Sequence, residues 1–194
     1  MFSKGLILAS TSRYRRALLG RLGLPFDCVA PQVEEARQPG ESPVAMAARL
    51  ARLKAEAVSR LHPAAVVIGS DQVALRGSDV LGKPGTVERC REQLQRSSGR
   101  DVVFLTAVHV VDGPAGRAEA HVDRTTVLFR ELSADEIDRY IERDRPLDCA
   151  GGFKAESLGI ALFEKIDSSD PTGLTGLPLA WVCGALRRAG LRLP

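Results

Sequence analysis

The stretch Ala65-Val-Val-Ile-Gly-Ser-Asp-Gln-Val-Ala-Leu75 is the part of the chain that decides the fold. Its β-branched apolar residues predict a buried strand, which delivers a glycine, a hydroxyl, a carboxylate and a carboxamide near its carboxyl end. In an open α/β sheet, ligands bind at the carboxyl ends of the strands. A carboxylate at that position, Asp71, loses its hydrating water, and this is costly unless a cation, a metal or a group of donors meets it. We therefore expect Asp71 to meet a metal or a water molecule that it activates.

Alternating helix and strand patterns precede this stretch, and hairpin patterns follow it. Strands are expected over residues 5–9, 26–30, 66–75, 102–111, 118–129 and 158–163. Helices are expected over residues 13–21, 43–61, 87–99, 134–143 and 179–188, several of them opened by Ser or Thr caps. This order predicts an α/β protein with a mixed, twisted β-sheet flanked by helices. We expect a single domain over residues 1–194, with two lobes around a central cleft.

Composition narrows the classes of partner. The chain has 194 residues with 27 basic and 24 acidic side chains, a formal net charge of +3. Interspersed charge of this kind does not predict a nucleic-acid-binding surface. The apolar run near Met1 is too short for a signal peptide, and no run approaches the roughly 18 residues of a membrane span. The sequence therefore predicts a cytoplasmic protein without nucleic-acid or membrane partners.

Two segments carry residues suited to phosphate. Ser10-Thr-Ser-Arg13 lies at a strand-to-helix junction, where backbone N–H groups and the helix dipole favour an anion. The alternative is a plain capping turn with a solvated arginine. Lys83 lies in Leu81-Gly-Lys-Pro-Gly85, a rigid glycine and proline frame that favours a phosphate contact over a solvated lysine.

Two further segments carry carboxylates. Glu34-Glu35 lies in an irregular loop, where exposed, hydrated carboxylates are one interpretation. The other is that a glutamate of this pair converges with Asp71, so that two carboxylates hold Mg²⁺ beside substrate phosphates. Lys154 and Glu156 follow a run of small residues that allows a ligand close to the backbone. They point the same way if this piece is extended, and the alternative is an exposed ion pair.

Five motifs in the same order resemble the Maf family of nucleoside triphosphate pyrophosphatases, once described as septum-formation inhibitors. They are Leu6-Ile-Leu-Ala-Ser-Thr-Ser-Arg13, Gly69-Ser-Asp-Gln72, Leu81-Gly-Lys-Pro84, Gly152-Phe-Lys-Ala-Glu156 and Asp170-Pro-Thr-Gly-Leu-Thr-Gly-Leu-Pro178. The resemblance implies a fold similar to house-cleaning nucleotide pyrophosphatases, a divalent metal (Mg, Mn or Co) and a possible homodimer. It implies that the substrate is a small-molecule nucleotide, cleaved to a nucleoside monophosphate and pyrophosphate.

The resemblance also implies roles for individual residues. Asp71 matches the family's general base, and the phosphate and metal residues match a set spread along the chain: Ser10, Arg13, Glu35, Lys54 and Lys83. Asp71 either activates the water or holds, with Glu35, the metal that does so. Lys54 and Lys83 count with Asp71 as catalytic, and Ser10, Arg13 and Lys154 as substrate-binding.

Base selection is expected from Tyr14, Gln72 and Glu156. Gln72 and Glu156 resemble the branch that acts on 7-methyl-GTP, whereas the dTTP and UTP branch typically has threonine and glutamine there. The 7-methyl-GTP branch usually has tryptophan where this chain has Tyr14, and often serine where it has Gly152. Hydrolysis of 7-methyl-GTP is thus the expected activity. The alternatives are a dTTP/UTP pyrophosphatase and a nucleotide-binding regulator of cell division that does not turn its ligand over.

Overall fold

The computed structural model describes residues 5–194. Residues 1–4, on which the expected absence of a signal peptide partly rests, lie outside the described part. The elements run in the order β1 (Gly5–Ala9), α1 (Arg13–Gly20), β2 (Asp27–Cys28), α2 (Pro43–Leu61), β3 (Ala65–Arg76), β4 (Asp79–Leu81), α3 (Val87–Ser97), β5 (Asp101–Asp112), η1 (Gly113–Ala115), β6 (Arg117–Phe129), α4 (Ala134–Asp144), η2 (Ala150–Gly152), η3 (Leu158–Leu162), β7 (Phe163–Ser168) and α5 (Leu179–Arg188). Within residues 5–194 no helix is long and apolar enough to cross a membrane.

The described strands form a mixed sheet in the order β2-β1-β3-β5-β6-β7, and β4 pairs with β3 off this path. β1 is parallel to both β2 and β3, with Leu8 opposite Ile68. β4 is antiparallel to β3, and β7 is antiparallel to β6, with a register shift at Leu128 and Phe129. Helical crossovers join the parallel strands, as parallel pairing requires. A tight turn joins the antiparallel β3 and β4, whereas the connection from β6 to β7 contains α4, η2 and η3. The predicted mixed α/β sheet flanked by helices is confirmed.

The chain divides into two compact units. Unit 1 comprises residues 5–72, 106–123 and 170–194, and unit 2 comprises residues 73–105 and 124–169. The expected cleft between two lobes stays a prediction.

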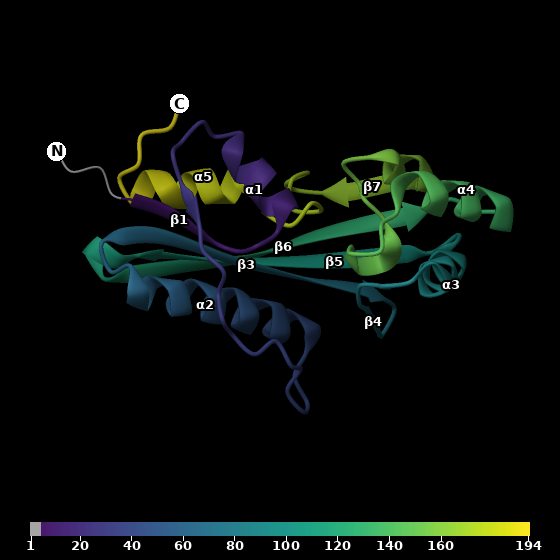
Figure 1. The fold of residues 1–194 in the computed structure, drawn as a ribbon, viewed down its shortest axis with the longest axis horizontal. Coiled ribbons are helices and arrows are strands. Elements are labelled where there is room, and N and C mark those ends of the chain that lie inside the picture. Colours follow the sequence, from purple (N-terminus) through teal and green to yellow (C-terminus); the bar gives the residue numbers. More distant parts are fainter. Residues whose placement is uncertain (1–4) are drawn as a thin grey trace. The chain divides into compact units, whose positions relative to one another are not determined.

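In unit 1, helices cover both faces of the sheet (Figure 1). The alternation of side chains along β1 sends Leu6 and Leu8 into a core shared with α1 and α5. It sends Ile7 and Ala9 to the opposite face, where Val58 of α2 packs. Gly69 allows α2 to approach β3 closely, because a Cβ at Gly69 would overlap the Ala51 carbonyl and lie 2.9 Å from the Ala55 Cβ. This approach brings Lys54 of α2 to Asp71, which is the seventh of the 12 residues of β3 and so lies in mid-strand, not near the carboxyl end as expected.

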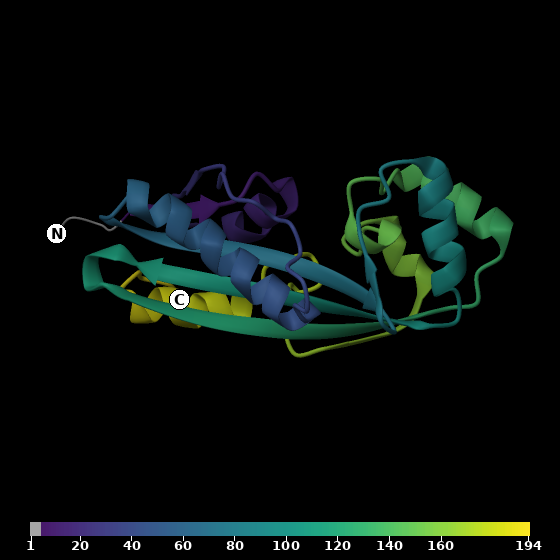
Figure 2. The same cartoon turned by 90° about the horizontal axis from the view of Figure 1, so that it is seen from below.

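In unit 2, α3 packs against α4 and η2 (Figure 2). Four phenylalanine rings of this unit contact one another in edge-to-face pairs, with ring centroids 4.8 to 5.5 Å apart: Phe104, Phe129, Phe153 and Phe163. Edge-to-face geometry is favoured because the positive edge of one ring meets the negative face of the next.

Local signals predicted most of the elements. Helix α2 begins after Ser42, whose side chain accepts from Ala45 N, with Pro43 in the first turn, as predicted. The capping box of Ser133 and Glu136 opens α4, also as predicted.

One strand prediction was wrong. Residues 158–162 form the 3-10 helix η3, and the strand begins only at Phe163. Backbone bonds three residues apart, Ser157 N to Lys154 O at 3.2 Å and Ile160 N to Ser157 O at 3.5 Å, close the chain into turns here. A short apolar run does not by itself distinguish a strand from a helical segment.

Candidate active site

A buried lysine lies between two carboxylates in unit 1. Lys54 Nζ of α2 lies 2.7 Å from Asp71 Oδ1 of β3 and 2.8 Å from Glu35 Oε1 of the preceding loop. Lys54 and Asp71 are only 5% and 8% exposed, whereas the Glu35 side chain is 61% exposed. Three residues predicted for the site are therefore in direct contact, and Glu35 opens the group to solvent.

Burial raises the pKa of Asp71 above its ordinary value. The positive charges of Lys54 and Arg15 pull the pKa down, and the negative charge of Glu35 pushes it up. Desolvation outweighs the attraction, because a carboxylate that has lost its water is costly even beside an ammonium. Asp71 thus accepts a proton more readily than an exposed aspartate does, which suits a general base.

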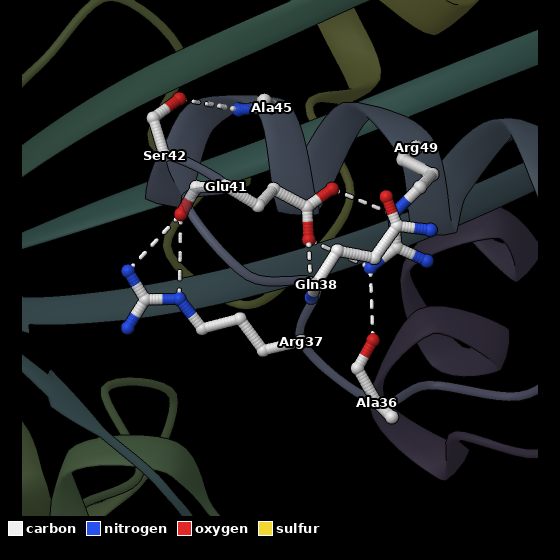
Figure 3. A network of polar contacts seen from close by, with 7 residues as sticks. All are labelled: Ala36, Arg37, Gln38, Glu41, Ser42, Ala45 and Arg49. Carbon is white, nitrogen blue, oxygen red and sulfur yellow. Dashed lines mark hydrogen bonds and ion pairs between the residues drawn. The ribbon is translucent and has the colours of Figure 1, made fainter.

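A network of hydrogen bonds ties the loop that bears Glu35 to helix α2 (Figure 3). Glu41 accepts a bidentate pair from Arg49, with Nε at 2.6 Å and Nη2 at 2.8 Å. Arg49 Nη2 also donates to Ala36 O at 3.0 Å, next to Glu35 in sequence. Arg49 and Lys54 belong to the same helix, so the loop is held to α2 at two points. The Glu35 carboxylate consequently reaches Lys54 from a fixed backbone.

Arg15 joins this group although sequence reasoning assigned the phosphate role to Arg13. Arg15 Nε donates to Gly176 O at 3.0 Å, and burial lowers the pKa of its guanidinium while the charges of Asp71 and Glu35 raise it. A signal for this orientation exists in the sequence. Arg15 precedes the buried Leu18 and Leu19 by three and four residues and so shares their helix face.

Arg13 lies on the exposed side of α1. Its Nη2 donates to the Tyr14 hydroxyl at 2.6 Å, and its guanidinium carbon lies 4.8 Å from the centroid of the Tyr14 ring. The predicted roles of Arg13 in phosphate binding and of Tyr14 in base binding stay predictions. A cationic base on this face of Tyr14 would have to displace Arg13.

Ser10 and Ser12 cap the strand-to-helix junction. Ser10 Oγ accepts from Ser12 N at 3.1 Å, and Ser12 Oγ accepts from Arg15 N at 3.4 Å. The capping turn is therefore present. Ser10 itself is 6% exposed, and its predicted contact with substrate stays a prediction.

Gln72 follows Asp71 in β3 and lies in unit 1. Its amide nitrogen donates to Thr106 Oγ1 at 2.9 Å, Gly173 O at 3.1 Å and Leu174 O at 3.0 Å. The donor end of Gln72 is thus engaged within the protein. Its predicted role in base selection stays a prediction.

The other predicted residues belong to unit 2. Lys83 lines a pocket of about 490 Å³, together with further charged side chains: Arg76, Asp79, Arg89, Glu92 and Arg96. Arg76 is paired with Asp79 at 3.2 Å, so cations exceed carboxylates on the remaining wall. Such a wall suits an anionic group.

Lys154 and Glu156 do not lie in an extended segment, so the condition under which their side chains were expected to point the same way is not met. Residues 155–157 form a turn because the chain closes back onto the Lys154 carbonyl. Lys154 N donates to the Tyr140 hydroxyl at 3.0 Å and Lys154 Nζ donates to Asp144 O, while Glu156 is exposed. Their assigned contacts with substrate stay predictions.

The carboxylates of unit 1 fit a metal that is shared with a ligand. Among residues 5–194 there is no group of three or more His, Cys, Asp or Glu side chains placed to hold a metal ion. Glu35 and Asp71 are two hard oxygen donors that converge on one ammonium. Mg²⁺ is commonly held by one or two carboxylates plus phosphate oxygens and water. The donor set therefore fits a metal that arrives with phosphate.

The fold places the chain in a known structural class. The structure of a HAM1 protein from Coxiella burnetii matches with a TM-score of 0.51 and 15% identity, covering 96% of this chain and 100% of that chain. At this identity the likeness concerns the fold.

The family follows from the sequence comparison. The chain belongs to the Maf-like protein family, whose model matches residues 5–189. A 7-methyl-GTP pyrophosphatase of Xanthomonas campestris pv. campestris is 56% identical over 97% of this chain and 98% of its own length. Relatives with the same name from Aromatoleum aromaticum and Pseudomonas putida are 52% and 48% identical, each over 97% of this chain and 97% and 98% of their own lengths. The family predicted from the five motifs is confirmed.

Proposed function

We propose that this protein hydrolyses 7-methyl-GTP to 7-methyl-GMP and pyrophosphate. The observation that carries the proposal is the buried Lys54–Asp71 pair with the exposed Glu35 beside it, in a chain 46–56% identical to proteins named 7-methyl-GTP pyrophosphatase. A dTTP/UTP pyrophosphatase is the alternative substrate assignment.

In the proposed reaction a water molecule attacks the α-phosphorus. A bond forms from the water oxygen to that phosphorus, and the bond to the oxygen bridging the α- and β-phosphates breaks, so that pyrophosphate leaves with the electron pair. Asp71 takes a proton from the attacking water, a role supported by its raised pKa. Lys54 orients the carboxylate of Asp71 and neutralises charge near it. Arg15 supplies a second positive charge beside the two carboxylates.

We further propose that the reaction needs a divalent metal, Mg, Mn or Co. Glu35 and Asp71 would hold it together with phosphate oxygens. Such a metal supplies positive charge that neutralises the phosphates and makes pyrophosphate a better leaving group.

Recognition of the base is assigned to Glu156 in this proposal. Guanine presents N1–H and N2–H₂ donors on one edge, and an ionised carboxylate accepts both. Methylation at N7 makes the base cationic, which adds attraction to a negative charge. Thymine and uracil lack this pair of donors.

Two further properties are part of the proposal: a cytoplasmic location and a homodimer. The composition of the sequence supports the first, and the family resemblance supports the second. Light scattering on the purified protein tests the second property.

A pyrophosphate-release assay with dTTP, UTP, CTP, GTP and 7-methyl-GTP, with and without Mg²⁺, tests the function. We expect the highest kcat/KM for 7-methyl-GTP and loss of turnover when EDTA removes the metal. A higher kcat/KM for dTTP or UTP would select the alternative substrate. Nucleotide binding without any turnover would instead select the cell-division regulator.

A further inference from the structure

Residues 170–178 form a segment that is anchored at the start of helix α5. Pro178 at the N-cap offers no side-chain cap, and two residues from the beginning of the segment replace it. Asp170 Oδ2 accepts from Ala180 N at 2.7 Å, and Thr172 Oγ1 accepts from Leu179 N at 2.8 Å. The beginning of the segment is therefore hydrogen-bonded to the first turn of α5.

The middle of this segment turns its carbonyl oxygens toward the polar residues in the middle of β3. Gly173 O and Leu174 O accept from Gln72 Nε2, and Gly176 O lies 2.9 Å from Ser70 Oγ. Ser70 and Gln72 are two residues apart and so lie on the same face of the strand. Asp71 lies on the other face, toward Lys54. The two neighbours of Asp71 thus bind the segment while Asp71 faces the candidate active site.

These donors are few and buried. Ser70 and Thr106 are 0% and 1% exposed, and Thr106 Oγ1 also donates to Gly173 O at 2.9 Å. The Ser70 hydroxyl carries one proton for two carbonyls, Ala107 O and Gly176 O. Removing the Ser70 hydroxyl takes a donor away from the buried Gly176 carbonyl and from Ala107 O, which weakens the hold on the backbone that carries Gly176.

Gly176 O has a second donor, Arg15 Nε, at 3.0 Å. Gly176 has a φ of +110°, which side-chain-bearing residues rarely adopt, and its carbonyl direction depends on that backbone. A Cβ there would also lie 3.4 Å from Arg15 Nε. The orientation of Arg15 therefore depends on the same carbonyl that Ser70 holds.

We propose that Ser70 is a positioning residue, which holds the Gly176 carbonyl and through it directs Arg15 toward Asp71 and Glu35. Gln72 and Thr106 support the same segment at Gly173 and Leu174. This inference rests on the proposed function for its catalytic readout. In this inference Ser70 and Gln72, the two neighbours of Asp71 in β3, hold the segment whose Gly176 carbonyl positions Arg15.

The test is a cycle of Ser70→Ala and Arg15→Lys. Arg15→Lys keeps a positive charge but removes the Nε donor to Gly176. A displacement near 1 Å can cost about 100-fold in rate, so we expect Ser70→Ala to lower kcat/KM by about 10- to 100-fold in the wild type. In the Arg15→Lys background the same change should cost less than about twofold, because the contact it supports is already absent.

Ser97→Ala is the matched control. Ser97 is also 0% exposed, and its hydroxyl donates to the backbone carbonyl of Gln93 at 2.8 Å in unit 2. We expect it to lower the melting temperature about as much as Ser70→Ala while kcat/KM stays unchanged. Ser70→Thr, which keeps the hydroxyl, should recover most of the rate.

A crystal structure of the Ser70→Ala protein provides a readout that does not depend on turnover. We expect Arg15 Nε to have left Gly176 O. An unmoved Arg15, or the same fold loss of kcat/KM in both Arg15 backgrounds, overturns the inference. If the wild type turns over no nucleotide, the proposed function fails, and the position of Arg15 in this crystal structure still decides the positioning role.

Discussion

Neutralising Lys54 should destabilise the folded protein, whereas neutralising its buried partner Asp71 should not. The two side chains are 2.7 Å apart and nearly inaccessible to water. Their environments differ because Lys54 has two carboxylate partners, whereas desolvation dominates the ionisation of Asp71.

For Asp71 the sign follows from the direction of its pKa shift. The folded-state pKa lies above the ordinary value of 3.8, so the ionised form is less favourable in the folded protein than in the unfolded chain. The free energy of unfolding of the wild-type protein therefore decreases as the pH rises from 3.8 through the folded-state pKa of Asp71, because the folded protein must give up a proton that it binds more tightly than the unfolded chain does. The neutral Asp71→Asn protein lacks this fall, so near pH 7 it should be as stable as wild type or more so.

For Lys54→Met the expected effect is destabilisation. The change leaves Asp71 and Glu35 facing each other without the ammonium that separated them. Removing one partner of a buried ion pair typically costs about 3–5 kcal/mol. Protonation of Asp71 relieves part of this cost, so we expect a loss of about 2–4 kcal/mol at pH 7.

Urea unfolding at several pH values measures both effects, and Arg52→Met is the control. Arg52 pairs with Glu56 on the exposed face of α2, and its loss should change the unfolding free energy by less than about 0.5 kcal/mol. Turnover of Asp71→Asn should fall by roughly 10²–10⁴-fold. An Asp71→Asn protein that is clearly less stable than wild type at pH 7, or that keeps near-normal turnover, would refute this reasoning.

Three further predictions concern other residues. Lys83→Ala should raise KM or lower kcat for every nucleotide alike, since phosphate contacts carry no base information; a loss confined to one base in the pyrophosphate assay would move Lys83 to base recognition. Glu156→Gln should selectively reduce kcat/KM for 7-methyl-GTP because it removes a charge and an acceptor, and an unchanged substrate ranking would contradict the assigned role. Hydrogen bonds from Arg49 lower the pKa of Glu41 to about 2, so its stabilisation is present above pH 4.5 and is lost as pH falls toward 2. Glu41→Gln should abolish this part of the pH dependence in thermal melts and should lower turnover through the loop that bears Glu35; identical acid limbs in both proteins would exclude the contribution of Glu41.

Signals confined to a few neighbouring residues predicted the elements well. Ser42 and Pro43 predicted where α2 begins, and Ser133 with Glu136 predicted the start of α4. A cap acts on backbone groups within one turn, so the information needed to find it lies in adjacent residues.

Predictions that depended on distant neighbours were less complete. Arg13 and Arg15 are both arginines at a helix start; the phosphate role predicted for Arg13, which is exposed, stays a prediction, and the contact of Arg15 with Gly176 was not predicted. Residues 158–162 are apolar enough for a strand, yet hydrogen bonds back to the Lys154 turn make them helical. The partner of Arg15, Gly176, lies 161 positions away, so the local pattern does not contain it. For residues 158–162 the bonds are local, but an apolar run is compatible with a strand and with a helical turn.

The sequence by itself determined that Asp71 lies on one face of β3 and that Ser70 and Gln72 lie on the other, because successive side chains of a strand alternate. Only the tertiary structure decided what each face meets. Lys54 reaches Asp71 across 17 positions, and the Gly176 carbonyl reaches Ser70 across 106. The alternation is a property of the covalent backbone, whereas these partners depend on how α2 and the segment before α5 pack onto the sheet.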